Sequence, residues 1–314
     1  MPGEVRVRTL IAGISETDLA LAHGWRPNGD AAPALTMGHE FVGVVESIGS
    51  TQDKKDAERF QGKRITGLPL VSCGKCDLCK RGLASHCREK TILGVMGRDG
   101  CLADGFTLPL RNLIALPDDL DDERATFAAA LSEAIHASQQ VHLEGKPYIT
   151  ILGEGTLALL CAQVMNKLNA SVRLVSRNEF NLALCDKWQV RHRHLDEVGR
   201  REDQDVVVDC TGSAEGLGTA LRLVRPRGTI LLKSIASFSG TPDASFDTSA
   251  IVMKEVRIQG SRAGGISEAI EMLRREQVEV ASLITRKVDL DEAERAMLWA
   301  GEPDQVKVLV RAAA

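Results

Sequence analysis

Four cysteines lie close together in the segment CGKCDLCKRGLASHC, which spans residues 73–87. They are Cys73, Cys76, Cys79 and Cys87. Four thiolates from one short segment can complete a tetrahedral shell around zinc and leave no position open for a substrate. Gly74 and Gly82 permit the tight turns that aim successive sulfurs inward. The spacing therefore predicts one structural zinc per chain rather than free or disulfide-bonded cysteines.

The other four cysteines are scattered along the chain. Cys161, Cys185 and Cys210 lie within apolar segments, so we expect them to be small core residues. Cys101 follows a glycine in a loop, and the pattern assigns it no role.

A second candidate metal site is the pair His39 and Glu40 in the segment GHEFVGVV, residues 38–45. An imidazole and a carboxylate can both bind zinc, but two protein ligands alone bind it weakly. The pair is thus a possible weak catalytic zinc site. A histidine that is merely hydrogen-bonded inside a β-rich domain is an equally good interpretation of His39.

The segment ILGEGTLA, residues 151–158, has the pattern of a dinucleotide-binding turn. An apolar strand precedes Gly153 and Gly155, and a helical stretch beginning at Thr156 and Leu157 follows them. The first glycine permits the tight turn, and the second lets the backbone approach a pyrophosphate at the helix N-terminus. Ala158 takes the third position, where a small residue suffices for helix–strand packing.

The next expected strand ends in LVSRN, with Ser176 followed by Arg177. An acid at this point would bind the ribose hydroxyls and favour NAD. A hydroxyl and a guanidinium instead suit a 2′-phosphate, although a solvated surface arginine is the alternative. The sequence therefore favours NADP, with NAD possible.

The elements that must position these residues follow two different sequence patterns. Residues 1–140 begin with short β-like runs separated by glycines, which indicates a β-rich domain, and residues 281–314 end in a helix and a closing strand. Residues 141–280 alternate apolar strands with helical stretches, which predicts a parallel sheet covered by helices. We therefore expect an α/β protein of two domains.

Composition and charge exclude several classes of function. Lys plus Arg number 39 and Asp plus Glu number 43, for a net charge of −4, so no basic face for nucleic acid or a membrane surface is expected. No apolar run is long enough to span a membrane, and the N-terminus MPGEVRVRTL lacks a signal-peptide core. We expect a cytoplasmic protein that acts on a small molecule.

Together these motifs resemble the zinc-containing medium-chain alcohol dehydrogenase family, in its sorbitol and threonine dehydrogenase-like branch. The matching segments, besides the cysteine lobe, are AGISETD (12–18), GHEFVGVVESIG (38–49), LGEGTLAL (152–159), DCTGSAEGLGTALRLVRPRGTILLKS (209–234) and VKVLV (306–310). The resemblance implies a GroES-like catalytic domain over 1–140 and 281–314 and a Rossmann doubly wound parallel sheet over 141–280. It also implies hydride transfer between an alcohol carbon and a nicotinamide, with a zinc that polarises the oxygen.

The chain departs from this family at two of the expected ligands of the catalytic zinc. Ser15 stands where the resemblance implies a cysteine, and a neutral hydroxyl is a far poorer ligand than a thiolate. The glutamate near the domain junction falls on Ala129, while Glu133 lies one helical turn later, about 6 Å along the axis. The resemblance keeps Thr17 as the hydroxyl of a proton relay and Asp18 as an acid behind the ligands.

The resemblance makes three further predictions. Lys307 matches a basic position near the cofactor pyrophosphate, so it can add a phosphate contact. The chain begins after the N-terminal hairpin that the family usually has, which leaves an exposed sheet edge unless another segment covers it. The family is usually dimeric or tetrameric, and GTILLKSIASF (228–238) is the kind of edge strand that pairs across a homodimer or homotetramer.

Two functions remain in competition at the level of sequence. The first is an NADP-preferring alcohol dehydrogenase or carbonyl reductase with a degenerate catalytic zinc site. The second is a catalytically weak or inactive relative that binds a dinucleotide without turnover. The intact glycine turn and Thr17 favour the first, whereas Ser15 and Ala129 favour the second. Substrate specificity lies in loops such as the one around Trp25, which the sequence does not decode.

Overall fold

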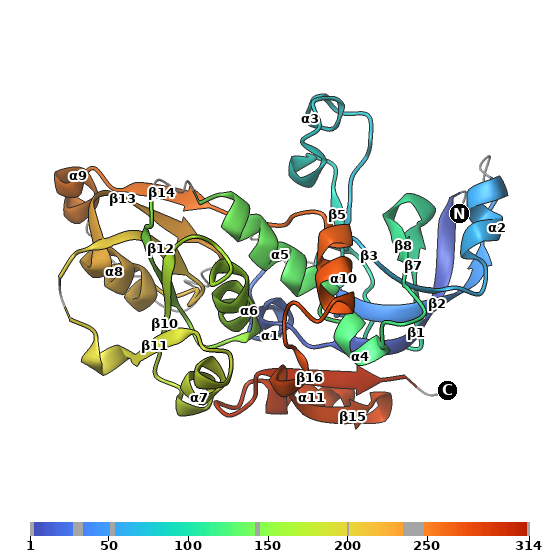
Figure 1. Cartoon of the computed structure of the whole chain (residues 1–314). Helices are drawn as coiled ribbons and strands as arrows, with labels where there is room; N and C mark the ends of the chain where they lie inside the picture. The colour runs from blue at the N-terminus through green and yellow to red at the C-terminus, as the bar shows by residue number, and fades with distance from the viewer. Residues whose placement is uncertain are drawn as a thin grey trace. The chain divides into compact units, whose positions relative to one another are not determined.

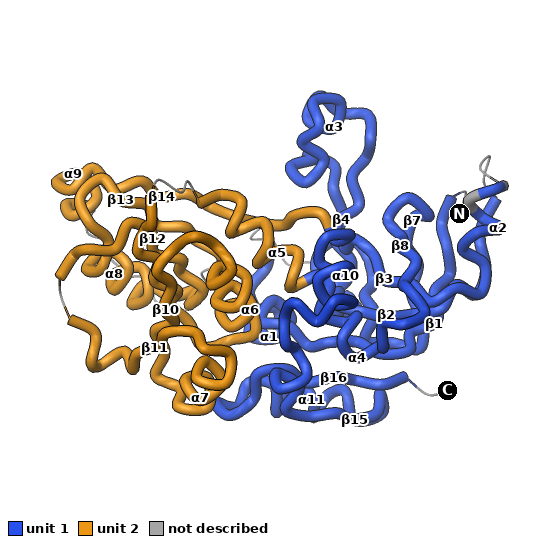
Figure 2. Tube along the Cα trace, viewed as in Figure 1, with its two compact units in different colours: residues 1–129, 266–314 blue, residues 130–265 orange. Residues whose placement is uncertain are grey.

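The computed structural model describes residues 3–27, 34–50, 54–141, 145–199, 201–234 and 248–312 (Figure 1). The chain forms two compact units, which Figure 2 shows in different colours. The first unit comprises residues 1–129 and 266–314, and the second comprises residues 130–265.

The two unit boundaries fall earlier than the sequence predicted, at 129/130 and 265/266 instead of 140/141 and 280/281. Most of helix α5 (Ala128–Gln139) belongs to the second unit. Helix α10 (Ile266–Arg274) belongs to the first unit, where it contacts α4 (Asp122–Ala125). Arg274 also forms an ion pair with Asp119, at 2.9 Å between Nε and Oδ2. Helical periodicity alone could not show which unit each helix joins.

The first unit is built around a mixed sheet with the strand order β15-β16-β1-β2-β3-β8, and β7 also pairs with β1. The strands are β1 (Glu4–Gly13), β2 (Glu40–Ile48), β3 (Arg64–Gly67), β7 (Gly105–Pro109), β8 (Leu113–Ala115), β15 (Ile284–Asp289) and β16 (Lys307–Arg311). The C-terminal strand β16 therefore returns to the first strand of the chain, which it joins antiparallel.

Strand β1 has partners along both sides, so other segments of the chain cover it and it is not an exposed edge. Besides β2, it pairs with β7 through residues 4–8 and with β16 through residues 11–13. The apolar faces of these strands form a core in which Phe41 and Phe106 meet edge to face, with ring centroids 4.7 Å apart.

The remaining elements of the first unit are short. The helices are α1 (Glu16–Ala22), α2 (Lys54–Phe60), α3 (Asp77–Lys80) and α11 (Ala293–Ala300), with 3-10 turns at Ala84–His86, Leu110–Asn112, Ala281–Leu283 and Leu290–Glu292. A small sheet contains β4 (Leu70–Val71), β5 (Thr91–Leu93) and β6 (Gly97–Arg98). Strands β4 and β5 flank the cysteine lobe in the sequence and pair antiparallel, which closes the lobe at its base.

The second unit is a six-stranded sheet in the order β11-β10-β9-β12-β13-β14, in which every pairing is parallel. Its strands are β9 (Tyr148–Leu152), β10 (Ser171–Ser176), β11 (Arg191–His194), β12 (Gln204–Asp209), β13 (Val224–Leu232) and β14 (Arg257–Gly260). Its other helices are α6 (Thr156–Met165), α7 (Glu179–Lys187), α8 (Ala214–Leu223) and α9 (Ser249–Lys254), and a 3-10 turn spans Leu195–Glu197. The predicted α/β class, with a β-rich domain and a doubly wound parallel sheet, is confirmed.

The sequence misplaced the edge strand of this sheet. Residues 228–234 of the predicted edge segment lie in or just after β13, which is internal between β12 and β14, and residues 235–238 lie outside the described part of the chain. The edge next to β13 is β14, whose four residues are all exposed. Its short sequence RIQG has no strong strand signal, so the predicted edge segment falls one strand too early.

Candidate functional site

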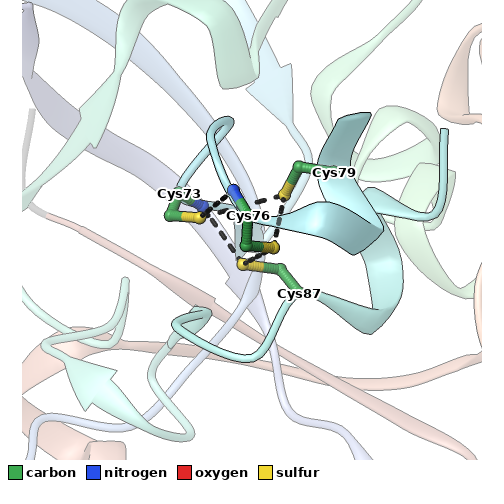
Figure 3. Close-up of side chains that lie close together, drawn as sticks. All are labelled: Cys73, Cys76, Cys79 and Cys87. Carbon is green, nitrogen blue, oxygen red and sulfur yellow. Dashed lines mark hydrogen bonds between the residues drawn. The ribbon is translucent and has the colours of Figure 1, made fainter. Parts of the chain in front are cut away.

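The four cysteines of the lobe are brought together as the sequence predicted. Their sulfurs all lie within 4.8 Å of one another, and they form the one such cluster of three or more potential metal ligands among the described residues. The Sγ–Sγ distances are 3.5 Å for Cys76–Cys79, 3.8 Å for Cys76–Cys87 and 4.0 Å for Cys73–Cys79 (Figure 3). A tetrahedral zinc with Zn–S bonds of about 2.3 Å requires edges of about 3.8 Å. The donor set therefore fits a closed zinc shell.

Backbone N–H groups of the lobe point at the sulfurs. The N–H of Cys73 donates to Cys87 Sγ at 3.3 Å, and the N–H of Cys76 donates to Cys73 Sγ at 3.4 Å. A backbone hydrogen bond from Cys79 lowers the pKa of Cys76 to about 6, whereas burial and the neighbouring thiols raise the pKa of Cys79 to about 11. Four thiols so close together cannot all ionise without a cation to neutralise them, which is what a bound zinc provides.

Asp18 is the centre of the site around His39. It is fully buried in α1 and accepts hydrogen bonds from Ser15 N at 2.9 Å, Ser15 Oγ at 2.7 Å and Gly38 N at 3.1 Å. His39 Nδ1 lies 3.6 Å from Asp18 Oδ1. Burial raises the pKa of Asp18, but the nearby His39 and the hydrogen bonds from Ser15 outweigh it and hold that pKa below its usual value. Asp18 therefore remains a carboxylate that orients His39.

Ser15 has a structural explanation that the sequence did not give. It is the N-cap of α1, where its hydroxyl accepts from Asp18 N at 3.2 Å while the Asp18 side chain accepts from Ser15 N. The Ser15 hydroxyl thus both accepts and donates within a capping box. The side chain at the position where the resemblance implies a cysteine therefore caps the N-terminus of a helix.

Glu40 is held by a buried lysine. Lys307 Nζ lies 2.8 Å from Glu40 Oε2 and donates to the carbonyl of Ile14 at 3.1 Å. The Lys307 side chain is 1 % exposed and the Glu40 side chain 5 %. Burial lowers the pKa of Lys307, but Glu40 and two further carboxylates raise it above its usual value, so the lysine is charged. The Lys307 cation also lies 5.8 Å from the centre of the Phe127 ring.

The sequence did not predict this pairing of Lys307 with Glu40, and the contact of Lys307 with a cofactor pyrophosphate stays a prediction. The side chain of Lys307 is 1 % exposed. Gly13 makes the pairing possible, because a Cβ at that position would lie 2.6 Å from Glu40 Oε2. The pattern VKVLV identified a basic residue at the start of the last strand, but only the pairing of β16 with β1 shows what it contacts.

The remaining candidates of the first unit are Thr17, Cys101 and Trp25. Thr17 is half-buried in α1, and its hydroxyl has no hydrogen-bond partner within the described parts of the chain. Cys101 is fully buried, and its thiol donates to the carbonyl of Glu40 at 3.5 Å. Burial and the carboxylates of Asp18 and Glu40 raise the pKa of Cys101, so it is a neutral thiol. Trp25 is half-buried, and part of its loop lies outside the described residues.

The junction helix α5 contains both Ala129 and Glu133. Glu133 Oε2 lies 3.4 Å from Lys233 Nζ, and the side chain of Lys233 is fully buried. Lys233 also donates to the carbonyls of Ser261 and Arg262. Lys233 is not among the predicted site residues, although a lysine directly after the apolar run ILL is a signal of a buried cation. Glu133 therefore has a counter-ion within the second unit.

The glycine turn has the geometry of a phosphate-binding loop. Gly153 directly follows β9 and has a φ of 143°, and a Cβ there would lie 3.1 Å from the Cβ atoms of both Ala158 and Cys210. Gly155 is the N-cap of α6, and no side chain caps that helix end. Gly155 has no side chain to stand between a bound phosphate and the first turn of α6, which starts at Thr156 and Leu157.

The end of β10 presents Ser176 and Arg177. Ser176 is buried and its Oγ accepts from the N–H of Asn178 at 2.9 Å. The Arg177 guanidinium is half-exposed and pairs with Glu215 at 2.6 Å, while its backbone N–H donates to Glu154 at 2.8 Å. The hydrogen bond and charge of Glu215 raise the pKa of Arg177. An exposed ion pair of this kind contributes only about 0–1 kcal/mol, so a ligand can displace Glu215 cheaply.

Two family models match the chain, and together they cover most of its length. The alcohol dehydrogenase GroES-like domain matches residues 1–118, and the zinc-binding dehydrogenase domain matches residues 155–277. The chain belongs to the zinc-containing medium-chain alcohol dehydrogenase family. The predicted resemblance is thereby confirmed, and the family is one of zinc-type oxidoreductases.

Proteins named as dehydrogenases are similar to this chain over nearly the whole length of both sequences. An L-threonine 3-dehydrogenase of Chelativorans sp. is 28% identical over 97% of this chain and 91% of its own. A D-arabitol-phosphate dehydrogenase of Enterococcus avium is 25% identical over 98% of this chain and 89% of its own. A zinc-binding dehydrogenase of Sinorhizobium meliloti 1021, solved bound to NADP, is 27% identical with a TM-score of 0.83, over 99% and 92% of the two chains.

No helix among the described residues is long and apolar enough to cross a bilayer.

Proposed function

We propose that this chain is an NADP-preferring alcohol dehydrogenase or carbonyl reductase whose catalytic zinc site is degenerate. The observation that supports this most strongly is the second unit's glycine turn, with its uncapped α6 N-terminus and Arg177 at the end of β10. The relatives that share both units are named dehydrogenases of threonine and of the polyol phosphate arabitol phosphate. The proposed substrate is accordingly a small hydroxylated molecule or the corresponding carbonyl compound.

The residues around His39 do not fit a second tetrahedral zinc. Glu40 is neutralised by Lys307, Ser15 caps α1, and Ala129 has no ligand atom. We therefore propose that any zinc at His39 is absent or partly occupied, and we route no chemical step through it. A bound nicotinamide would supply the hydride chemistry. We assign Thr17 to the proton relay, and we assign Asp18 to holding the His39 ring in place.

A catalytically weak, dinucleotide-binding relative is the second candidate. The closed Glu40–Lys307 pair favours it, because in the family's own scheme that carboxylate would be available to a metal. One experiment separates the two candidates: the purified protein is mixed with NADPH and a panel of polyol-derived ketones and aldehydes, and NADPH oxidation is followed. Steady oxidation with any member supports the enzyme, whereas saturable NADPH binding without oxidation across the panel supports the binding protein.

The cofactor preference has its own test at Arg177. Replacing Arg177 with Ala should weaken NADPH binding by about 1.5–3 kcal/mol, the value of a charged hydrogen bond, and should leave NADH binding nearly unchanged. Fluorescence titration with each reduced cofactor measures both affinities. Arg222→Ala, at an exposed arginine of α8, is the matched control. Tighter binding of NADH than of NADPH by the unaltered protein would refute the NADP preference.

We also propose that the chain assembles as a homodimer or homotetramer through the β14 edge. All four residues of β14 are exposed, and the neighbouring α9 presents Val252 and Met253, which are 71% and 82% exposed. An exposed strand edge next to apolar side chains is a suitable surface for pairing with a second copy. Sedimentation of the unaltered protein and of an Ile258→Pro variant tests this, because proline removes an N–H from the edge.

A further inference from the structure

The second unit contains a pocket at the edge of its sheet opposite to the glycine turn. Because the strands are parallel, their first residues share one edge, and the glycine turn follows the last residue of β9 at the other. The pocket has a volume of about 550 Å³. It is lined by Tyr148, Ser171, Val172, Arg173, Asp186, Gln189, Val190, Arg191, His192, Arg193, Asp203 and Gln204. It is therefore separate from the cofactor turn.

Three arginines of this pocket lie on the same face of the sheet. Arg173 of β10 is in register with Arg191 of β11, and Arg193 is two residues further along the same strand. Side chains in register, and those two residues apart, project from one face of a sheet. Arg191 and Arg193 are exposed, whereas Arg173 is half-buried between them and the centre of the sheet.

The floor of the pocket is polar where a sheet face would ordinarily be apolar. Arg173 Nε donates to Thr150 Oγ1 at 2.8 Å, and Thr150 Oγ1 donates to Gln204 Oε1 at 2.6 Å. Thr150 and Gln204 are buried, with exposed fractions of 0% and 4%. Nε is the one nitrogen of Arg173 that has a partner among the described residues. The two terminal nitrogens of a half-buried guanidinium thus remain available inside the pocket.

The charges around Arg173 are only partly balanced. Burial lowers the pKa of Arg173, Asp203 acts in the opposite direction, and the charge of Arg193 lowers it further. Asp203 also accepts from Gln204 Nε2 at 2.6 Å, and the second carboxylate of the lining, Asp186, lies 3.8 Å from His192. Like charges on neighbouring strands repel each other and destabilise the sheet unless an anion lies between them.

We propose that this pocket is a binding site for a small molecule that carries a phosphate group. Guanidinium groups form paired, charge-assisted hydrogen bonds with phosphate oxygens, and arginines at three positions of two adjacent strands line this pocket. The volume lies within the range of small-molecule sites and accommodates a phosphate ester of the size of a sugar phosphate. Tyr148, which is 55% exposed at the start of β9, offers a ring to the organic part.

The experiment uses inorganic pyrophosphate as the probe, with ribose 5-phosphate and ribose as the organic arms. Isothermal titration of the full chain, with and without saturating NADPH, should show saturable pyrophosphate binding that NADPH does not abolish. Arg173→Gln should weaken this binding by at least about tenfold, because a charged hydrogen bond is lost in a partly buried site. Arg191→Gln, at an exposed position that leaves the buried network intact, should weaken it by a smaller factor.

The control is Arg222→Gln, which removes an exposed arginine of the same unit outside the pocket and should leave the affinity unchanged. Circular dichroism checks that Arg173→Gln remains folded, and the Arg191→Gln titration decides the matter if it does not. Ribose 5-phosphate binding without ribose binding identifies the phosphate as the recognised group. Competition by NADPH, or equal affinity in the arginine variants and the control, would overturn the proposal and leave the arginines as charges that protect the sheet edge.

Discussion

The cysteine lobe and the His39 site belong to the same unit and both contain potential metal ligands, but the negative charges of the two sites have different partners. In the lobe, the four sulfurs face one another at 3.5–4.0 Å in the three measured pairs, and backbone N–H groups are their other neighbours. Around His39, each anionic group already has a protein cation or donor: Lys307 for Glu40, and Ser15 and His39 for Asp18.

This difference shows that ligand type does not define a metal site by itself. The negative charge of the lobe requires a cation from solution, whereas the charge around His39 is balanced within the chain. A buried carboxylate that has gained a lysine gives up that lysine only if another cation replaces it, because an unpaired buried charge costs several kcal/mol. We propose that the counter-ion, more than the serine at position 15, distinguishes the two sites.

The largest effect is expected from breaking the lobe. Cys76→Ser should remove zinc from the chain, because structural zinc binding of this kind is worth on the order of 10 kcal/mol and a hydroxyl does not ionise to replace the thiolate. Zinc per chain, measured by mass spectrometry of the metal, should fall from about one to near zero. The control is Cys185→Ala, a buried cysteine outside the lobe, which should keep its zinc. A chain that contains no zinc before the substitution would contradict the prediction.

The second effect comes from removing the internal cation. Lys307→Met should lower the free energy of unfolding by about 3–5 kcal/mol at neutral pH, because it leaves the buried Glu40 without a partner. The double variant Lys307→Met with Glu40→Gln should recover most of that loss. Urea unfolding of the three proteins measures it. If the single and double variants are equally unstable, the loss is one of packing and the charge argument fails.

The same pair makes a pH prediction. The folded pKa of Lys307 lies above its unfolded value of 10.5. A raised pKa means that the stabilisation is fully present below pH 10.5 and is lost as the pH rises through the folded pKa. The unaltered protein should therefore lose stability in this alkaline range more steeply than the double variant.

The sequence predicted the lobe more completely than the His39 site, for a physical reason. A zinc lobe is local: its ligands lie within residues 73–87, so spacing contains most of the geometry. The His39 network joins α1, β2 and β16, and Lys307 is separated from Glu40 by 267 positions. No periodicity or motif reports a contact that depends on the pairing of β16 with β1.

The predictability of the fold likewise depends on how far apart in the sequence the contacting segments lie. Both the parallel sheet and the β-rich unit were predictable, because alternation of strands and helices is a local pattern. The pairing of β7 with β1 and the internal place of β13 were not, because strand order is decided by long-range packing. The sequence predicts that Ser15 is a lost zinc ligand. Its capping box leaves only one trace in the sequence, the three-residue spacing of Ser15 and Asp18.

If charge balance decides which site binds zinc, adding anionic ligands should make the His39 site bind zinc as the cysteine lobe does. Ser15→Cys with Ala129→Glu restores two anionic ligands, and the zinc content should rise toward about two per chain. The gain should be incomplete, because Lys307 still neutralises Glu40. Adding Lys307→Met should raise the zinc content further if the counter-ion is what excludes the metal. An unchanged content of one zinc in the triple variant, with the lobe intact, would show that the geometry and not the charge excludes it.

The smallest effect concerns the Ser15 cap. Ser213 is the N-cap of α8, and its hydroxyl likewise accepts from a backbone N–H, that of Gly216 at 3.0 Å. Ser213→Ala should therefore cost about 1 kcal/mol, the usual value of an N-cap. Ser15→Ala should cost about 2 kcal/mol, because the hydroxyl also donates to the buried Asp18 carboxylate at 2.7 Å. Thermal and urea unfolding of the two variants compare the costs directly.

The loss of stability at acidic pH, which we call the acid limb, tests the Ser15→Ala variant more specifically than its total stability does. The folded pKa of Asp18 lies below 3.8, so its stabilisation is present above that pH and is lost as the pH falls through the folded pKa. Removing the Ser15 donor raises that folded pKa toward the unfolded value, so the acid-induced loss contributed by Asp18 should be smaller in Ser15→Ala. Ser213→Ala should keep the acid dependence of the unaltered protein. Identical acid limbs in the two variants would mean that Ser15 only starts a helix and that His39 alone keeps Asp18 ionised.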